Sequence, residues 1–186
     1  MWLLAFGVLA FSAVHLVPAV PAVKARFAER IGPAYGPLFG AASVVTLLLV
    51  IVGWRMSSFV PVYDPPAGGR YVTFGLVLLG FLGLGIFLFR GRLRQWLRFP
   101  LALGTIAWAA GHLMANGDLA SLVLFGGLFV YAAAHLLLGL AAGIRPTPDV
   151  RPGHDLLSIL AGLALFGVFV QLHGTIIGVP IVTLSK

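Results

Sequence analysis

The sequence contains no cysteine and very few acidic residues. Its 186 residues include five Asp and Glu against twelve Lys and Arg, and charged residues of all kinds make up only 9% of the chain. The absence of cysteine excludes disulfides, iron–sulfur clusters and thiolate chemistry. The apolar segments hold no pair of carboxylates, which argues against acid–base hydrolysis. It also weakens, without excluding, a proton-coupled transporter, since such proteins usually carry an acid within the membrane.

Apolar residues fill most of what remains. Hydrophobic residues account for 60% of the chain, and the mean hydropathy is +1.06. A soluble domain cannot cover that much apolar surface, whereas a lipid bilayer can. The apolar residues form long runs and do not alternate with polar ones, which favours helices over a β-barrel. We therefore predict an all-α fold, a polytopic helical bundle in a membrane.

Short connections rich in Pro, Gly and Arg separate the apolar runs, and none is long enough to form a domain. We therefore expect one domain over residues 1–186, with about six transmembrane helices. The first run lacks the basic start of a signal peptide, so we expect it to be retained. The six segments are Trp2–Val17, Pro37–Met56, Tyr71–Arg90, Pro100–Ala115, Leu119–Ala142 and Leu156–Val179. The first and fourth are shorter than the roughly 20 residues that span a bilayer.

The net charge of +7 comes from basic residues between the apolar runs, so we do not expect nucleic acid as a partner. Most Lys and Arg residues lie in the first, third and fifth connections, whereas Arg55, Arg70 and Lys186 lie on the other side. The positive-inside rule places the richer connections in the cytoplasm. We therefore expect a multi-pass protein of the bacterial cytoplasmic (inner) membrane, with both termini outside.

The most informative stretch is FPLALGTIAWAAGHLMANGDLASLVLFG, residues 99–126. It predicts an apolar helix, a polar tip at Asn116-Gly117-Asp118 and a second apolar helix. We expect Gly117 to adopt the left-handed conformation that ends a helix. Asp118 is expected to cap the second helix, with its charge at the positive end of the helix dipole. The result is a tight helical hairpin.

Four histidines lie inside apolar segments, and each needs a reason because a lone imidazole in lipid is costly. They are His15, His112, His135 and His173. One explanation is a structural hydrogen bond to a neighbouring helix. The more specific one is axial ligation of haem, for which neutral imidazole is the usual ligand. At 1.5 Å per residue His15, His135 and His112 lie roughly 20, 24 and 12 Å below the outer surface. Depth alone favours His15 with His135, and it allows His15 with His112.

His112 shares one helix face with Trp108 and Asn116, which lie four residues before and after it. Small residues beside His112 leave room for a neighbouring backbone or a flat ligand. If haem binds here, we expect Trp108 to line it. Asn116 is then expected to bond to a ligand histidine or to a propionate.

The segment HLMANGDLASLVLFG, residues 112–126, resembles the signature hairpin of the NnrU family. The early histidine in residues 11–32, YDPP at residues 63–66 and LHGTIIGVP at residues 172–180 also fall where that family has similar segments. The resemblance covers nearly the whole chain. It implies a multi-pass membrane protein associated with nitrite and nitric oxide metabolism, that is, with denitrification.

NnrU proteins are similar to 15-cis-zeta-carotene isomerase, which holds haem b between two histidines. Those ligands fall here on His15 and His112, so the resemblance implies haem b held by this pair. The chain departs from these relatives in two places. It has Phe99-Pro100 where they carry His-Pro, and it lacks the cysteine proposed to exchange with a haem ligand. Isomerisation by that exchange is therefore not expected.

Three functions remain open from the sequence. The first is a haem b protein of NnrU type, and the second is a haem-dependent cis–trans isomerase of a carotenoid-like polyene. The third is a transporter or assembly factor without a cofactor, whose histidines only bridge helices. The expected partners are the lipid bilayer, a lipid-like or nitrogen-oxide small molecule, and other membrane proteins.

Overall fold

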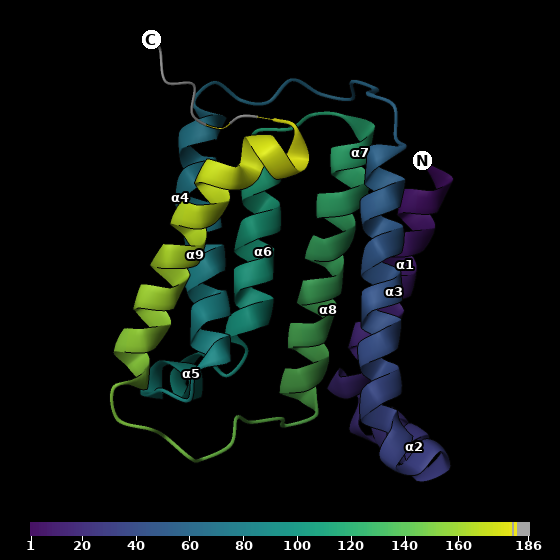
Figure 1. The fold of residues 1–186 in the computed structure, drawn as a ribbon, viewed down its shortest axis with the longest axis vertical. Coiled ribbons are helices and arrows are strands. Elements are labelled where there is room, and N and C mark those ends of the chain that lie inside the picture. Colours follow the sequence, from purple (N-terminus) through teal and green to yellow (C-terminus); the bar gives the residue numbers. More distant parts are fainter. Residues whose placement is uncertain (180, 182–186) are drawn as a thin grey trace.

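The structure is a computed structural model that describes residues 1–179 and 181. Within this part the chain is helical, and no strand is assigned to it. Six helices run along the height of the bundle (Figure 1). They are α1 (Trp2–Leu16), α3 (Tyr35–Arg55), α4 (Gly69–Leu88), α6 (Pro100–Leu113), α8 (Gly127–Ala141) and α9 (His154–Ile177).

The lengths of these helices suit a multi-pass membrane protein, as predicted. Five helical stretches of the described residues are long and apolar enough to cross a membrane: Trp2–Ala19, Pro21–Arg55, Gly69–Leu88, Leu119–Ala141 and His154–Ile177. At 14 residues α6 is shorter, in line with the short fourth segment. Large apolar side chains such as Leu9 and Val130 are 69% and 67% exposed, which suits a surface covered by lipid.

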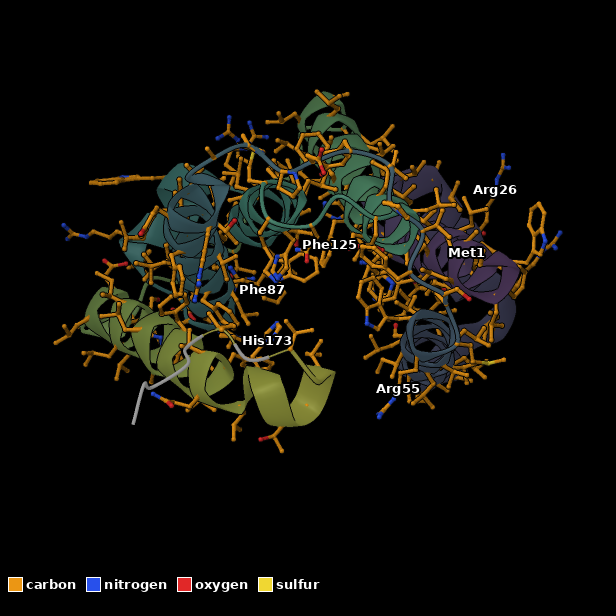
Figure 2. All side chains as sticks on the ribbon, turned by 90° about the horizontal axis from the view of Figure 1, so that it is seen from above. Met1, Arg26, Arg55, Phe87, Phe125 and His173 are labelled. Carbon is orange, nitrogen blue, oxygen red and sulfur yellow. The ribbon has the colours of Figure 1, made fainter. Side chains whose placement is uncertain are left out.

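The six long helices form an open arc. Along the arc, α9 packs on α4, α4 on α6, α6 on α8, α8 on α1, and α1 on α3. Figure 2 shows the arc from above, with α9 and α3 at its two ends and a concave side between them. This order differs from the order in the sequence, because α8 separates α1 and α3 from the rest.

Glycines set the closest approaches between helices. A Cβ atom on Gly83 of α4 would lie 2.6 Å from the carbonyl oxygen of Pro100 and 2.8 Å from the Cα of Gly104 in α6. A Cβ atom on Gly7 of α1 would lie 2.8 Å from the backbone nitrogen of Val50 in α3. Backbone therefore packs directly on backbone at both contacts, as small residues allow within membranes.

The predicted hairpin is present, with Asp118 in its predicted role. Asp118 caps α7 (Leu119–Ser121): Oδ1 accepts from the backbone N–H of Ser121 at 3.0 Å, and Oδ2 accepts from its hydroxyl at 2.5 Å. Asp118 is only 9% exposed, so these bonds also satisfy a buried carboxylate.

The prediction for Gly117 was wrong, because its φ is not among the positive values of the chain. Glycine is needed there for space, since a Cβ atom would collide with the carbonyl oxygen of Tyr63. The connection between α3 and α4 causes this contact. The N–H groups of Val62 and Tyr63 donate to the Gly117 carbonyl at 2.8 and 3.0 Å. Backbone pairing with this distant segment, and not a helix C-cap, fixes Gly117.

Several helical elements were not predicted. The first connection contains η1 (Val17–Ala19), α2 (Pro21–Ile31) and η2 (Gly32–Ala34), and the third contains α5 (Arg92–Leu97). η3 (Leu122–Gly126) is a π-helix between α7 and α8. None of the residues of α2 is buried, and Figure 1 shows α2 at the lower end of the bundle. We call this end, which carries α2, α5 and residues 142–153, the basic end.

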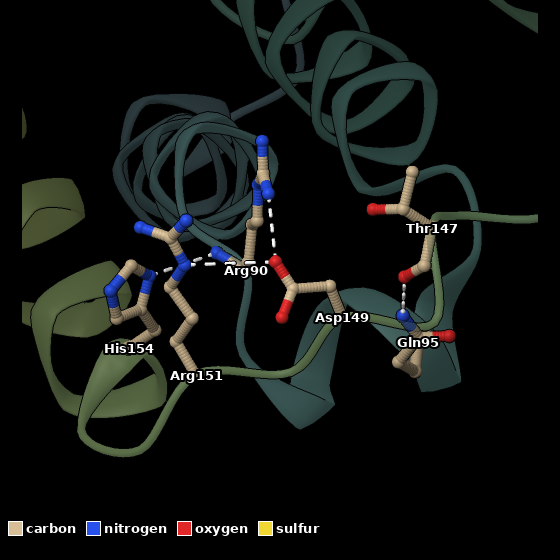
Figure 3. Close-up of polar contacts among 6 residues, drawn as sticks. All are labelled: Arg90, Gln95, Thr147, Asp149, Arg151 and His154. Carbon is tan, nitrogen blue, oxygen red and sulfur yellow. Dashed lines mark hydrogen bonds and ion pairs between the residues drawn. The ribbon is translucent and has the colours of Figure 1, made fainter.

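An exposed ion-pair cluster joins the connections of the basic end (Figure 3). The Asp149 carboxylate accepts a hydrogen bond from Arg90 Nη1 at 2.8 Å, and Arg151 Nε lies 3.7 Å from the same oxygen. His154, the first residue of α9, accepts a hydrogen bond from the backbone N–H of Arg90 at Nδ1, at 3.1 Å. These contacts hold residues 142–153 against the end of α4.

Replacing Arg90 with glutamine is expected to raise the pKa of Asp149. The hydrogen bond from Arg90, helped by the charge of Arg151, holds the pKa of this exposed carboxyl below its usual value. Because the charged carboxylate is the stabilised form, the pair is complete above a pH of about 3.9. It is lost as the pH falls through the lowered pKa. Carbon NMR titration of the Asp149 carboxyl measures the shift, with Arg92→Gln in α5 as control. An unchanged pKa in Arg90→Gln would contradict this account.

Candidate functional site

His15 of α1 and His135 of α8 form one aromatic group near the basic end. Both rings contact Tyr131 of α8, with centroids 6.2 Å from His15 and 6.1 Å from His135. Phe11 stacks on His15 at 3.9 Å with an interplanar angle of 23°, and Phe39 of α3 meets the same imidazole edge-on at 5.6 Å. The similar depths predicted for His15 and His135 agree with their shared contact. We call these five residues the basic-end group.

His112 of α6 belongs to a second aromatic group, near the hairpin. Phe125 stacks on its imidazole at 4.4 Å with an interplanar angle of 19°, and Trp108 lies at 4.6 Å. His173 comes from α9, the helix at one end of the arc. Figure 2 shows Phe125 and His173 on the concave side of the arc. We call these four residues the hairpin-end group.

His15 and His112 make the same hydrogen bond. In each, Nδ1 lies 2.8 Å from the carbonyl oxygen of the residue four positions earlier, which is Phe11 for His15 and Trp108 for His112. A carbonyl oxygen only accepts, so each Nδ1 must carry a proton. In a neutral imidazole Nε2 then carries the free lone pair. Histidines that bind metals are held in this way, with one nitrogen fixed by a carbonyl and the other free to ligate.

The other two histidines differ from this pair in their surroundings. His173 lies at the end of α9, where its Nδ1 is 2.7 Å from the carbonyl oxygen of Val179. His135 has a buried Nδ1 without a hydrogen-bond partner among the described residues. The four histidines therefore divide into three whose Nδ1 is fixed by a carbonyl and one whose Nδ1 has no partner.

Comparison with known proteins gives a match over nearly the whole chain. A model of the NnrU protein family matches residues 3–181. The chain belongs to the NnrU family. This confirms the resemblance noted in the hairpin segment. The comparisons found no match among curated proteins and none among solved structures.

Of the predicted residues around His112, Trp108 contacts the imidazole ring and Asn116 contacts the backbone. The Asn116 side chain donates from Nδ2 to the carbonyl oxygen of His112 at 2.8 Å. It therefore supports the last turn of α6 and makes no bond to the ring. Asn116 was predicted to bond to a ligand histidine or to a propionate. It bonds to His112, the proposed ligand, but at the main-chain carbonyl and not at the ring.

Tyr63 and Phe125 are site residues of this NnrU-family protein that the sequence analysis missed. The Tyr63 hydroxyl donates to the carbonyl oxygens of Leu113 and Asn116, the second at 2.8 Å, and so ties the α3–α4 connection to the end of α6. The YDPP motif was the signal for this contact. Phe125 lies in the π-helix η3, and no pattern in the sequence marked it.

The protein side chains by themselves do not form a metal cage. No group of three or more His, Cys, Asp or Glu side chains that could hold a metal ion occurs within residues 1–179 and 181. A histidine pair is sufficient only where a macrocycle supplies the remaining ligands of the metal, as in haem.

Proposed function

We propose that this NnrU-family protein binds haem b in the bacterial inner membrane, with His15 and His112 as axial ligands. We propose further that it works in nitrite and nitric oxide metabolism. One observation carries the proposal: both histidines hold Nδ1–H at 2.8 Å on the carbonyl oxygen four residues earlier in their own helix, which leaves the lone pair of Nε2 for a metal. Haem iron is bound by neutral imidazole in many proteins. The choice of this pair is supported by the resemblance to 15-cis-zeta-carotene isomerase.

The neighbouring side chains suit a flat, apolar macrocycle. Phe11 stacks on His15, and Phe125 and Trp108 flank His112. These rings pack on one side of each imidazole. Asn116 and Tyr63 hold the end of the helix that carries His112. When bound, haem would supply an iron that carries out one-electron chemistry.

The visible absorption spectrum of detergent-purified protein tests the proposal. We expect a Soret band in the oxidised protein and sharp α and β bands after reduction with dithionite, as for six-coordinate haem b. A pyridine haemochrome assay gives the haem content per chain. A colourless protein that also fails to take up added haemin would overturn the proposal. The metabolic role is tested separately, by nitrite and nitric oxide consumption in cells that lack the gene.

A further inference from the structure

Arg98, between α5 and α6, is a partly buried cation without an acidic partner. Its Nη2 donates to the carbonyl oxygen of Ile144 at 2.9 Å. Its Nε is buried and has no hydrogen-bond partner among the described residues. The five acidic residues all lie in the described part, and their ion pairs involve Asp149 with Arg90 and Arg151. An anion from outside the chain would pair this partly buried charge.

The backbone at Arg98 is strained. Its φ of 57° and ψ of −48° are unusual for a residue with a side chain, and no other non-glycine residue in the described part has a positive φ. The N–H of Phe99 donates to the carbonyl oxygen of Leu97 at 2.5 Å, which closes a three-residue γ-turn around Arg98. Such strain persists where the surrounding structure holds the residue, and it is frequent at ligand sites.

His135 brings a second polar group to the same place. Phe99 connects the two residues, because the Arg98 guanidinium lies 5.6 Å from the centre of the Phe99 ring and the His135 imidazole lies 6.2 Å from it. Phe99 is held against α8, where a Cβ atom on Gly139 would lie 2.5 Å from its ring. Arg98 and His135 are therefore both neighbours of the Phe99 ring, and each has a buried nitrogen without a hydrogen-bond partner among the described residues.

The position of these nitrogens limits what can bind them. They lie at the basic end, where the helices reach the membrane surface, and Tyr131 continues from His135 along α8 toward His15. A ligand here meets a cationic group first and aromatic rings behind it. The planar guanidinium matches carboxylate and phosphate groups, which it can bind through two parallel hydrogen bonds.

We propose that Arg98 and His135 bind the acidic group, a carboxylate or a phosphate, of an amphiphilic ligand whose apolar part lies along Tyr131. Two molecules supply this chemistry in a membrane. One is haem, through a propionate, and this source rests on the proposed function. The other is an anionic phospholipid, through its phosphate, and this source does not depend on haem binding.

Two binding experiments on the purified protein test the proposal. The first titrates the protein with haemin and with haemin dimethyl ester, whose propionates are blocked. The second uses native mass spectrometry to compare the retention of phosphatidylglycerol and phosphatidylethanolamine. The variants are Arg98→Gln and His135→Gln, with Arg98→Lys to keep the charge and Arg92→Gln as a control on exposed α5. Circular dichroism and thermal unfolding show whether each variant is folded.

For a propionate, wild-type protein is expected to prefer haemin to the ester by about tenfold or more, as for a charged hydrogen bond. Arg98→Gln should abolish that preference, His135→Gln and Arg98→Lys should reduce it, and Arg92→Gln should keep it. For a phospholipid, Arg98→Gln should lose phosphatidylglycerol while haemin and its ester bind alike.

The proposal is overturned if Arg98→Gln is folded and keeps both the preference for haemin and the retained phosphatidylglycerol. If the wild-type protein binds no haemin at all, the haem function fails by itself. The lipid experiment then tests the acidic-group site by itself. If Arg98→Gln no longer retains phosphatidylglycerol, the site is supported, and if its retention is unchanged, the site is refuted.

Discussion

Replacing His15 or His112 with alanine is expected to remove the six-coordinate haem spectrum. Each variant keeps one imidazole, so the iron loses one axial ligand and the sharp reduced bands disappear. The double variant keeps neither Nε2 donor, and its haem content per chain is expected to fall by more than about tenfold. Loss of groups that only support metal ligands already costs that much. Reduced-minus-oxidised spectra and the pyridine haemochrome assay measure both effects.

The matched control is His173→Ala, which removes the other histidine of the hairpin-end group. It is expected to keep six-coordinate haem b. His135 is also a neighbour of His15 through Tyr131, so it offers the alternative ligand that depth favours. If His135→Ala removed the sharp bands and His112→Ala kept them, the ligand pair would be His15 and His135.

Replacing Gly83 with valine is expected to cause a large loss of stability. Its Cβ atom would meet the carbonyl oxygen of Pro100 at 2.6 Å and the Cα of Gly104 at 2.8 Å. Both are backbone atoms of α6, so neither can move away unless the two helices separate. Overpacking of this kind costs about 1–3 kcal/mol, and we expect a value at the upper end of that range.

Gly75→Val is the matched control, because Gly75 lies on the same helix and a Cβ atom there meets nothing within 4 Å. Its effect on the free energy of unfolding is expected to be small. Unfolding of both variants in detergent, followed by circular dichroism, measures the difference. If the two substitutions destabilised the protein equally, the close packing of α4 on α6 would not be the cause.

The apolar runs predicted the long helices well, because in lipid a backbone must satisfy its own hydrogen bonds within each segment. The start of the hairpin helix at Pro100 and the cap at Asp118 are local features, and both were predicted. The contact of Trp108 with His112 is equally local, since the two are one helical turn apart.

Features that depend on distant parts of the chain were not predicted. Glycine is required at position 117 because of the backbone of Tyr63, and no residue next to Gly117 in the sequence predicts that contact. The π-helix η3 changes the direction of the residues after it, so a regular helical period misplaces Phe125. Arg98 was expected mainly to orient the protein in the membrane, with a lipid or nucleotide phosphate site for the basic run as the alternative. That its buried Nε has no partner among the described residues is visible only once its neighbours are known.

The place of α8 between α1 and α6 determines when the protein can be completed in a cell. Leu4 and Val8 of α1 share a buried cluster with Ala120, which the ribosome adds much later than α1 and α3. Until α8 is made, α1 and α3 must therefore stay in the bilayer, with the surface of α1 that later contacts α8 covered by lipid or by the insertion machinery. His15 and His112 join one arc only after α8 is inserted between their helices. Loading of the proposed haem would then follow the synthesis of α8, and chains that stop before residue 119 would not retain it.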